Sequence, residues 1–154
     1  MSHAFTMTEI AVVSVVVGSL AVFFVPRFAG AGEDTRHADT AMALQQIAGA
    51  FDRFRRSNGY WPPEIGAGRM PPEMRSSFRE HNPFAGPTPI GGVFDYDNLP
   101  SESALIIAIR GSREHPLPGV SDAMMLDSLL DDGNLRTGNF RLLGDGYAYA
   151  FNRK

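Results

Sequence analysis

The chain has 154 residues and a formal net charge of −3, so the overall charge provides no basic footprint for nucleic acid. This length allows an N-terminal helix and one small domain, and it predicts no second domain. The absence of cysteine excludes a disulfide framework, a thiolate metal site and a cysteine nucleophile. The 16 glycines and 11 prolines favour a loop-rich domain over a helical bundle.

The N-terminal stretch is an apolar run over residues 5–25 that contains a single ionisable side chain, Glu9. A helix of about 20 apolar residues is long enough to cross a bilayer, so the run predicts a transmembrane helix over residues 5–28. A carboxylate inside hydrocarbon costs about 2.5–3.5 kcal/mol at the helix centre, so we expect Glu9 to have a cationic partner. Pro26 ends the run and has no amide proton, which predicts a helix kink there.

Two other interpretations of this stretch stay open at this point. A secretory signal also begins with an apolar run, and Ala29-Gly30-Ala31 resembles its cleavage site, but no basic segment precedes the run here. A plain signal anchor explains the length of the run, yet it gives Glu9 no partner.

A second helical pattern follows the apolar run and predicts an amphipathic helix over residues 35–57. Its apolar positions recur at intervals of three or four residues: Ala41, Leu44, Ile47, Ala48, Phe51 and Phe54. Asp52 and Arg56 stand at positions i and i+4, where opposite charges support a helix. The pair Asn58-Gly59 then provides a C-terminal stop.

These first residues resemble the processing and methylation segment of type IV pilins and type II secretion pseudopilins. The N-terminal match consists of Ala4, Phe5, Thr6, Glu9, the β-branched run and Pro26. Pseudopilins also end the amphipathic helix with an Asn-Gly-aromatic-Pro sequence, which here is Asn58, Gly59, Tyr60, Trp61 and Pro62. The resemblance extends to about Pro62, and beyond Pro63 it concerns only the general plan of a small antiparallel sheet packed on the helix.

The resemblance implies a processing pathway and a set of partners. Prepilin peptidase would cut between Ala4 and Phe5, which removes residues 1–4 as a leader, and Phe5 would then be N-methylated. Glu9 would set the register of a filament by pairing with the Phe5 amine of a neighbour. The implied partners are other pilin or pseudopilin subunits, the peptidase and an inner-membrane assembly platform. The implied location is a single pass through the bacterial inner membrane, with residues 29–154 in the periplasm or in a surface filament.

The remainder of the chain predicts a loop region over residues 58–90, with one short helix at 72–80, followed by a sheet and a short helix over 91–154. Residues 93–97 place Phe94 and Tyr96 opposite the two aspartates Asp95 and Asp97, as in a half-buried strand. Residues 105–109 are apolar on both faces, which predicts a central strand.

Residues 121–130 predict a packing helix that Ser121 or Asp122 begins. Strands at 140–143 and 147–151 are joined by the Asp-Gly hairpin signal at 144–146, and their aromatic stripe is expected in the core. The predicted fold class is therefore α+β and pilin-like. A long N-terminal helix, transmembrane in its first half and amphipathic in its second, packs on a small C-terminal antiparallel β-sheet.

The sequence gives no support for catalysis. The four histidines, His3, His37, His81 and His115, have no metal-ligand spacing, and each is predicted to be a surface residue. A nucleophile elbow, a P-loop and a GxGxxG motif are all absent, so we expect no enzyme.

Calcium is the one cofactor left open. The resemblance implies it, because related pseudopilins bind calcium in a C-terminal loop, and Asp131, Asp132 and Asn134 could contribute ligands here. EF-hand spacing is absent, and the alternative is a solvated helix end with Asp127, Asp131 and Asp132 on an exposed face.

The predicted function is that of a structural pseudopilin subunit in a type II secretion-like filament, assembled through its N-terminal helix. Two alternatives stay open: a minor type IV pilin used in adhesion, motility or DNA uptake, and a membrane-anchored periplasmic binding domain that does not polymerise.

Overall fold

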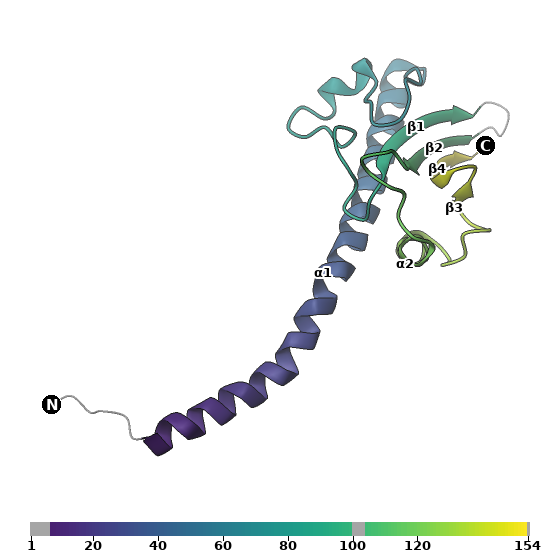
Figure 1. Cartoon of the computed structure of the whole chain (residues 1–154). Coiled ribbons are helices and arrows are strands. Elements are labelled where there is room, and N and C mark those ends of the chain that lie inside the picture. Colours follow the sequence, from purple (N-terminus) through teal and green to yellow (C-terminus); the bar gives the residue numbers. More distant parts are fainter. Residues whose placement is uncertain (1–6, 100–103, 154) are drawn as a thin grey trace. The chain divides into compact units, whose positions relative to one another are not determined.

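The computed structural model describes residues 7–99 and 104–153. Figure 1 shows its elements in the order α1, η1, β1, β2, α2, β3 and β4. α1 spans Met7–Asn58, and the short 3-10 helix η1 spans Pro72–Ser76. Contacts between Cα atoms divide the chain into two compact units, Met1–Thr35 and Arg36–Lys154. We call the second unit the head.

The N-terminal part of α1 overturns the predicted fold class and location. Among the residues that the structure describes, no helix is both long enough and apolar enough to span a bilayer. α1 itself runs without a break from Met7 to Asn58, through Pro26, Glu33 and Asp34. The transmembrane half of the predicted pilin-like fold, and the single pass through the inner membrane, were wrong.

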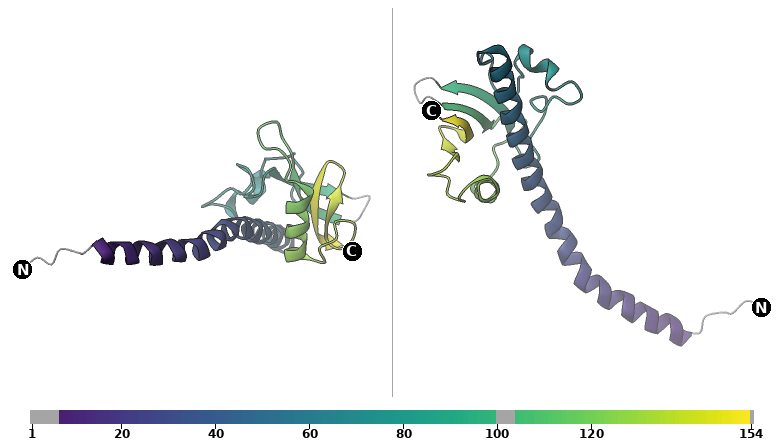
Figure 2. Two further views of the ribbon diagram at one scale, coloured as in Figure 1. Left: turned by 60° about the horizontal axis from the view of Figure 1, so that its bottom comes forward. Right: turned by 180° about the vertical axis from the view of Figure 1, so that it is seen from behind.

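The head contains a four-stranded sheet in the order β1-β2-β4-β3 (Figure 1). The strands are β1 at Val93–Leu99, β2 at Ala104–Arg110, β3 at Phe140–Leu143 and β4 at Gly146–Arg153. Every neighbouring pair is antiparallel. α2, at Val120–Leu130, precedes β3, and both views in Figure 2 show it beside the β3 end of the sheet.

Local sequence patterns account for the strands. β2 lies between β1 and β4 and is buried on both faces, which confirms the prediction of a central strand from its continuous apolar run. The hairpin between β3 and β4 turns at Gly144, whose φ of 60° is a backbone conformation that glycine adopts without strain. The predicted hairpin is therefore confirmed.

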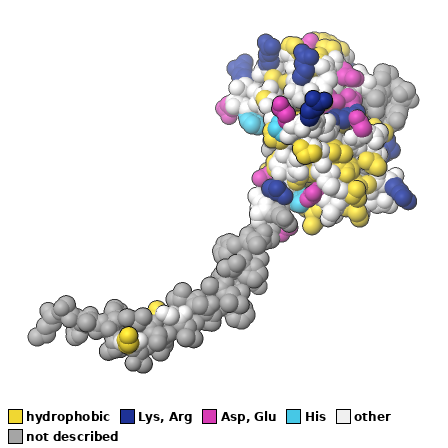
Figure 3. Space-filling model, viewed as in Figure 1, with side chains coloured by type: hydrophobic (Ala, Val, Ile, Leu, Met, Phe, Trp, Pro, Cys, Tyr) yellow, Lys and Arg dark blue, Asp and Glu magenta, His cyan; other side chains and the backbone are white. Residues whose placement is uncertain are grey.

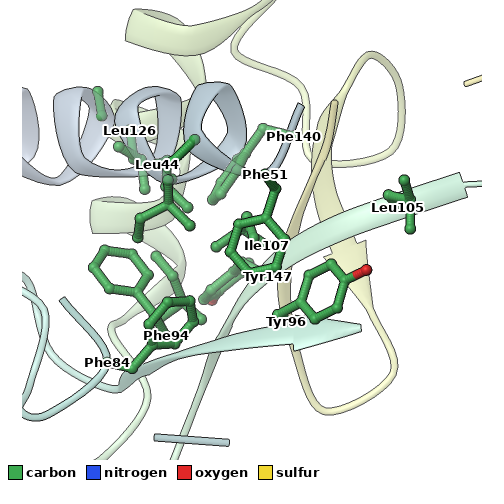
Figure 4. Close-up of a cluster of buried hydrophobic side chains, with 14 of the residues drawn as sticks. Leu44, Phe51, Phe84, Phe94, Tyr96, Leu105, Ile107, Leu126, Phe140 and Tyr147 are labelled. Carbon is green, nitrogen blue, oxygen red and sulfur yellow. The ribbon is translucent and has the colours of Figure 1, made fainter. Parts of the chain in front are cut away.

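The core lies between one face of the sheet and the head part of α1, with α2 beside it. Figure 4 shows Leu44 and Phe51 of α1 among side chains from the strands and α2. The Phe51 and Tyr96 ring centroids are 4.3 Å apart. Tyr147 is buried there, and Tyr149 and Phe151 pack against the cluster, so the aromatic stripe is core as predicted. The opposite face of the sheet holds a smaller cluster of Ile106, Ala108, Ala148 and Ala150.

Two short elements differ from their predictions. The helix expected at 72–80 is only the 3-10 turn η1, in which the Ser77 amide donates to the Met74 carbonyl, and the chain beyond it is irregular. Neither Ser121 nor Asp122 is the N-cap of α2. Gly119 takes that position, and its carbonyl accepts the Ala123 amide at 3.0 Å.

Loops of the chain bind the outer edges of the sheet. Beside β1, the Gly68 amide donates to the Phe94 carbonyl at 2.9 Å, and Pro87 forms an isolated bridge with Val93. Beside β3, the Leu142 amide donates to the Leu135 carbonyl, also at 2.9 Å. Both edge strands therefore have hydrogen-bond partners on the side away from the sheet.

Candidate functional site

The residues that the sequence assigned to processing and assembly are not part of the described head. Ala4 and Phe5 lie outside the described residues. Glu9 and Pro26 belong to α1, but their side chains lie outside what the structure describes. The proposed cleavage, methylation, register and kink therefore stay predictions.

The head instead brings three carboxylates together at the C-terminal end of α2. Asp127, Asp131 and Asp132 each offer an oxygen, and these oxygens all lie within 4.8 Å of one another. Asp127 lies on the last turn of α2, and Asp131 is the C-cap residue, whose amide donates to the Asp127 carbonyl at 2.7 Å. We call these three residues the acidic cluster.

Asp127 is the unusual member of the acidic cluster. Its side chain is 0% exposed, and neither of its carboxylate oxygens has a hydrogen-bond partner within the described chain. Burial, together with the charges of Asp132 and Asp131, raises the pKa of Asp127 to about 6. A buried carboxylate without a partner costs stability, so a proton or a bound cation would stabilise the fold at this position.

The loop that follows α2 holds the other two carboxylates in place. Asp132 accepts the Thr137 hydroxyl at 2.7 Å and the Asn134 amide at 2.9 Å, and these hydrogen bonds lower its pKa. Asp131 accepts the Asn139 amide. The loop is therefore folded around the carboxylates of Asp131 and Asp132.

The arrangement fits a hard divalent cation. Calcium is bound by oxygen ligands at about 2.3–2.6 Å, so two oxygens on one ion can be up to about 5 Å apart, which the acidic cluster satisfies. Three carboxylates supply only part of the six to eight oxygens that calcium takes, so backbone carbonyls and water would complete the shell. Asn134, which the sequence grouped with Asp131 and Asp132, uses its side-chain oxygen to accept the Arg136 amide at 3.2 Å.

Sequence reasoning found Asp131 and Asp132 but placed Asp127 wrongly on an exposed helix face. The sequence did contain a pattern that indicates the burial of Asp127. Ala123, Leu126, Asp127 and Leu130 stand at i, i+3, i+4 and i+7, which is the buried stripe of an amphipathic helix. Asp127 was the polar residue within that stripe.

A second group of charges lies on the sheet face away from α1. Asp95 and Asp97 of β1 are both buried, although the sequence pattern had assigned them to a solvated face. Arg110 of β2 lies between three carboxylates: its Nη2 donates to Asp97 at 2.7 Å, its Nε is 3.5 Å from Asp95, and its Nη1 pairs with Asp145. The register explains the meeting, because Val93 pairs with Arg110 and places Asp95 and Asp97 on the same face.

Asp95 is still incompletely satisfied. Its Oδ1 has no hydrogen-bond partner within the described chain. Burial and the charge of Asp97 outweigh the opposing effect of Arg110, and together they raise the pKa of Asp95 to about 6. This group contains its own cation, so it is a structural ion-pair network rather than a metal site.

One of the histidines differs from its prediction as a surface residue. His37 of α1 is buried, and its Nε2 lies 3.0 Å from Oδ1 of Asp122 at the start of α2. This contact joins the two helices of the head. His81 is exposed, His115 is half-buried, and His3 lies outside the described residues.

Comparisons with known proteins add no relative. No protein-family model, no curated protein and no solved structure matches this chain.

Proposed function

We propose that the chain is a structural subunit of a pseudopilin-type filament and that it assembles through the N-terminal part of α1. The observation that carries the proposal is the N-terminal segment itself, in which an apolar run over residues 5–25 contains Glu9 as its one ionisable side chain. The sequence Asn58-Gly59-Tyr60-Trp61-Pro62 at the end of α1 extends the resemblance.

The position of the core supports the same proposal. Among the described side chains, the buried ones on α1 begin at His37, within the head, and the core cluster begins at Ala41. Residues up to Thr35 form a separate compact unit, in which the described side chains of Met7 and Val13 are exposed. Exposed apolar side chains on a helix can be covered by like subunits in a filament.

In this proposal Glu9 pairs with the methylated Phe5 amine of a neighbouring subunit. The amine exists only after prepilin peptidase has cut between Ala4 and Phe5. Removal of one partner from a buried ion pair costs about 3–5 kcal/mol, because the other charge is left without a partner. Glu9→Ala should therefore be produced normally but should assemble poorly.

The test compares filament yield from cells that produce the full chain together with a prepilin peptidase. Sedimentation and electron microscopy should show filaments from the parent, a large loss for Glu9→Ala and partial retention for Glu9→Asp. Glu114→Ala, which removes an exposed carboxylate in the head, is the matched control. Mass spectrometry should find a mature N-terminus at Phe5 with one added methyl group. Parent-like filament yield from Glu9→Ala would refute the assembly role.

We also propose that the acidic cluster binds calcium. The specific observation is that Asp127 is fully buried and has no hydrogen-bond partner within the described chain, although it lies within reach of two further carboxylates. Calcium would replace the missing partner and hold the loop after α2, which is a structural role.

Calorimetric titration of the full chain with calcium chloride tests this second proposal directly. We expect one site per chain in the parent and none in Asp127→Asn. Asp145→Asn, which removes a carboxylate outside the acidic cluster, should bind like the parent. Equal calcium binding by Asp127→Asn and the parent would exclude the acidic cluster as the site.

A further inference from the structure

An apolar groove lies on the head beside the acidic cluster. It has a volume of about 460 Å³ and is lined by α2, by β3 and by the loop between them. Val120 and Met124 of α2 and Leu142 of β3 are all exposed large hydrophobic residues in this lining. Figure 3 shows hydrophobic side chains gathered over this part of the head.

The groove also carries a positive charge. Arg136 is part of its lining, is exposed and has no ion-pair partner among the described residues. The occupant that complements such a groove presents an apolar side chain with a carboxylate beside it.

The head itself presents such a surface on α1. Five of the exposed large hydrophobic residues among the described part of the head belong to α2 and β3. The other two are Met42 and Tyr60. Tyr60 packs against Phe54 of its own chain, with ring centroids 5.5 Å apart. Met42 is 56% exposed, and Asp39, which is exposed and has no ion-pair partner within the described chain, stands one helical turn before it.

A single copy cannot bring these two surfaces together. Met42 lies on the face of α1 opposite Thr40, Leu44 and Ile47, which are buried, and Asp39 lies on the side of α1 one turn before Met42. The groove lies on α2 and β3, whose buried residues Ala123, Leu126 and Phe140 contact the same core. The two surfaces therefore face outward from different elements, and they can meet only between copies.

We propose that Asp39 and Met42 of one copy dock into the groove of a second copy, with Met42 between Val120, Met124 and Leu142 and with Asp39 paired to Arg136. The contact is heterologous, because each copy uses two different surfaces. Repetition of a heterologous contact that does not close into a ring generates an open helical filament. The inference rests on the proposed function, since it names the contact between heads in such a filament.

The chain has no cysteine, so introduced cysteines report the contact without background. A 1:1 mixture of full-length Met42→Cys and Met124→Cys, treated with a short bis-maleimide under filament conditions, should give a crosslinked dimer. Ser76→Cys, exposed on η1, replaces Met124→Cys in the control mixture and should give none.

Exchange of the two charges tests the pairing itself. Asp39→Arg and Arg136→Asp should each reduce the crosslinked dimer about tenfold, because each places like charges opposite one another. The double variant Asp39→Arg with Arg136→Asp should restore the dimer. Loss in both single variants without recovery in the double variant would overturn the ion pair and with it the proposed docking.

Filament yield and crosslink position separate the two proposals. Filaments without a crosslink between positions 42 and 124 would overturn the docking and leave the proposed function standing. A crosslink without filaments would support the docking and overturn the filament function. Absence of both would overturn both.

Discussion

Asp95 and Asp127 are two buried carboxyl groups, and the fold compensates the cost of burying their charge in different ways. Burial and a neighbouring aspartate raise the pKa of each to about 6. Asp95 has Arg110 across the strand pair, whereas the charged neighbours that act on Asp127 are both acidic. The comparison teaches that the fold supplies a cation internally at one position and leaves the other to a proton or an external ion.

Removal of the internal cation should have the largest effect. Arg110→Leu would leave Asp95 and Asp97 facing one another without a counter-charge, so we expect the free energy of unfolding to fall by about 3 kcal/mol at pH 7. Trp61, the one tryptophan in the chain, lies in the head with its ring centroid 6.0 Å from that of Phe151, so its fluorescence can follow urea unfolding. Arg113→Leu, which removes an exposed arginine, is the control. A loss no larger than that of the control would remove the distinction between the two carboxyl groups.

Neutralisation of Asp127 should act in the opposite direction. In the presence of a chelator at pH 7, Asp127→Asn removes a charge that the fold holds at a cost, and we expect the free energy of unfolding to rise by about 1–2 kcal/mol. Saturating calcium should stabilise the parent and not the variant, since calcium binds the folded state through this carboxylate. The measurement is the urea midpoint with chelator and with calcium. A variant that calcium still stabilises like the parent would contradict the comparison.

Stability should depend on pH in a direction that both carboxyl groups set. The folded pKa values of about 6 lie above the ordinary aspartate value of 3.8, so the folded state holds more protons than the unfolded state between these values. Their contribution to stability is fully present below about pH 4 and is lost as the pH rises through 6.

The urea midpoint of the chelated parent should therefore be higher at pH 5 than at pH 7, by an amount equivalent to about 1–2 kcal/mol. Asp127→Asn should reduce this difference between the midpoints at pH 5 and pH 7. Calcium should remove the same part of the difference, because a bound cation keeps Asp127 deprotonated. A midpoint that rises with pH across this interval would show that neither carboxyl group has a raised pKa.

The exposed partner of Arg110 should matter least. Asp145 is 87% exposed in its side chain, so its ion pair with Arg110 is screened by water, and Asp145→Asn should change the free energy of unfolding by less than about 0.5 kcal/mol. Asp97→Asn, which weakens a buried contact of the same guanidinium, provides the contrast in the same urea assay. An equal loss for both variants would show that burial does not set the strength of this network.

The sequence predicted the regular parts of the head better than its charged sites. The continuous apolar run of β2 and the turn at Gly144 each depend on local chemistry, and both are where the patterns placed them. The burial of Asp95 and Asp97 depends instead on which strand lies beside β1 and in which register, and no local pattern contains that information. The pairing of His37 with Asp122 likewise joins residues far apart in the sequence.

The membrane assignment failed for a different reason. The prediction assigned residues 5–28 as the transmembrane half of a long helix, because an apolar run of about 20 residues matches the thickness of a bilayer. Among the residues that the structure describes, α1 is not apolar enough to span a bilayer, although it continues without a break to Asn58.

The covered edges of the sheet have a consequence for misassembly. An open edge strand offers unpaired amides and carbonyls on which another chain can add as a β-strand, and this is a common start of amyloid-like aggregation. Here the Gly68 amide donates to the Phe94 carbonyl at one edge, and the Leu142 amide donates to the Leu135 carbonyl at the other. These backbone groups of the two edge strands are already paired within the chain, so a strand of another copy cannot pair with them.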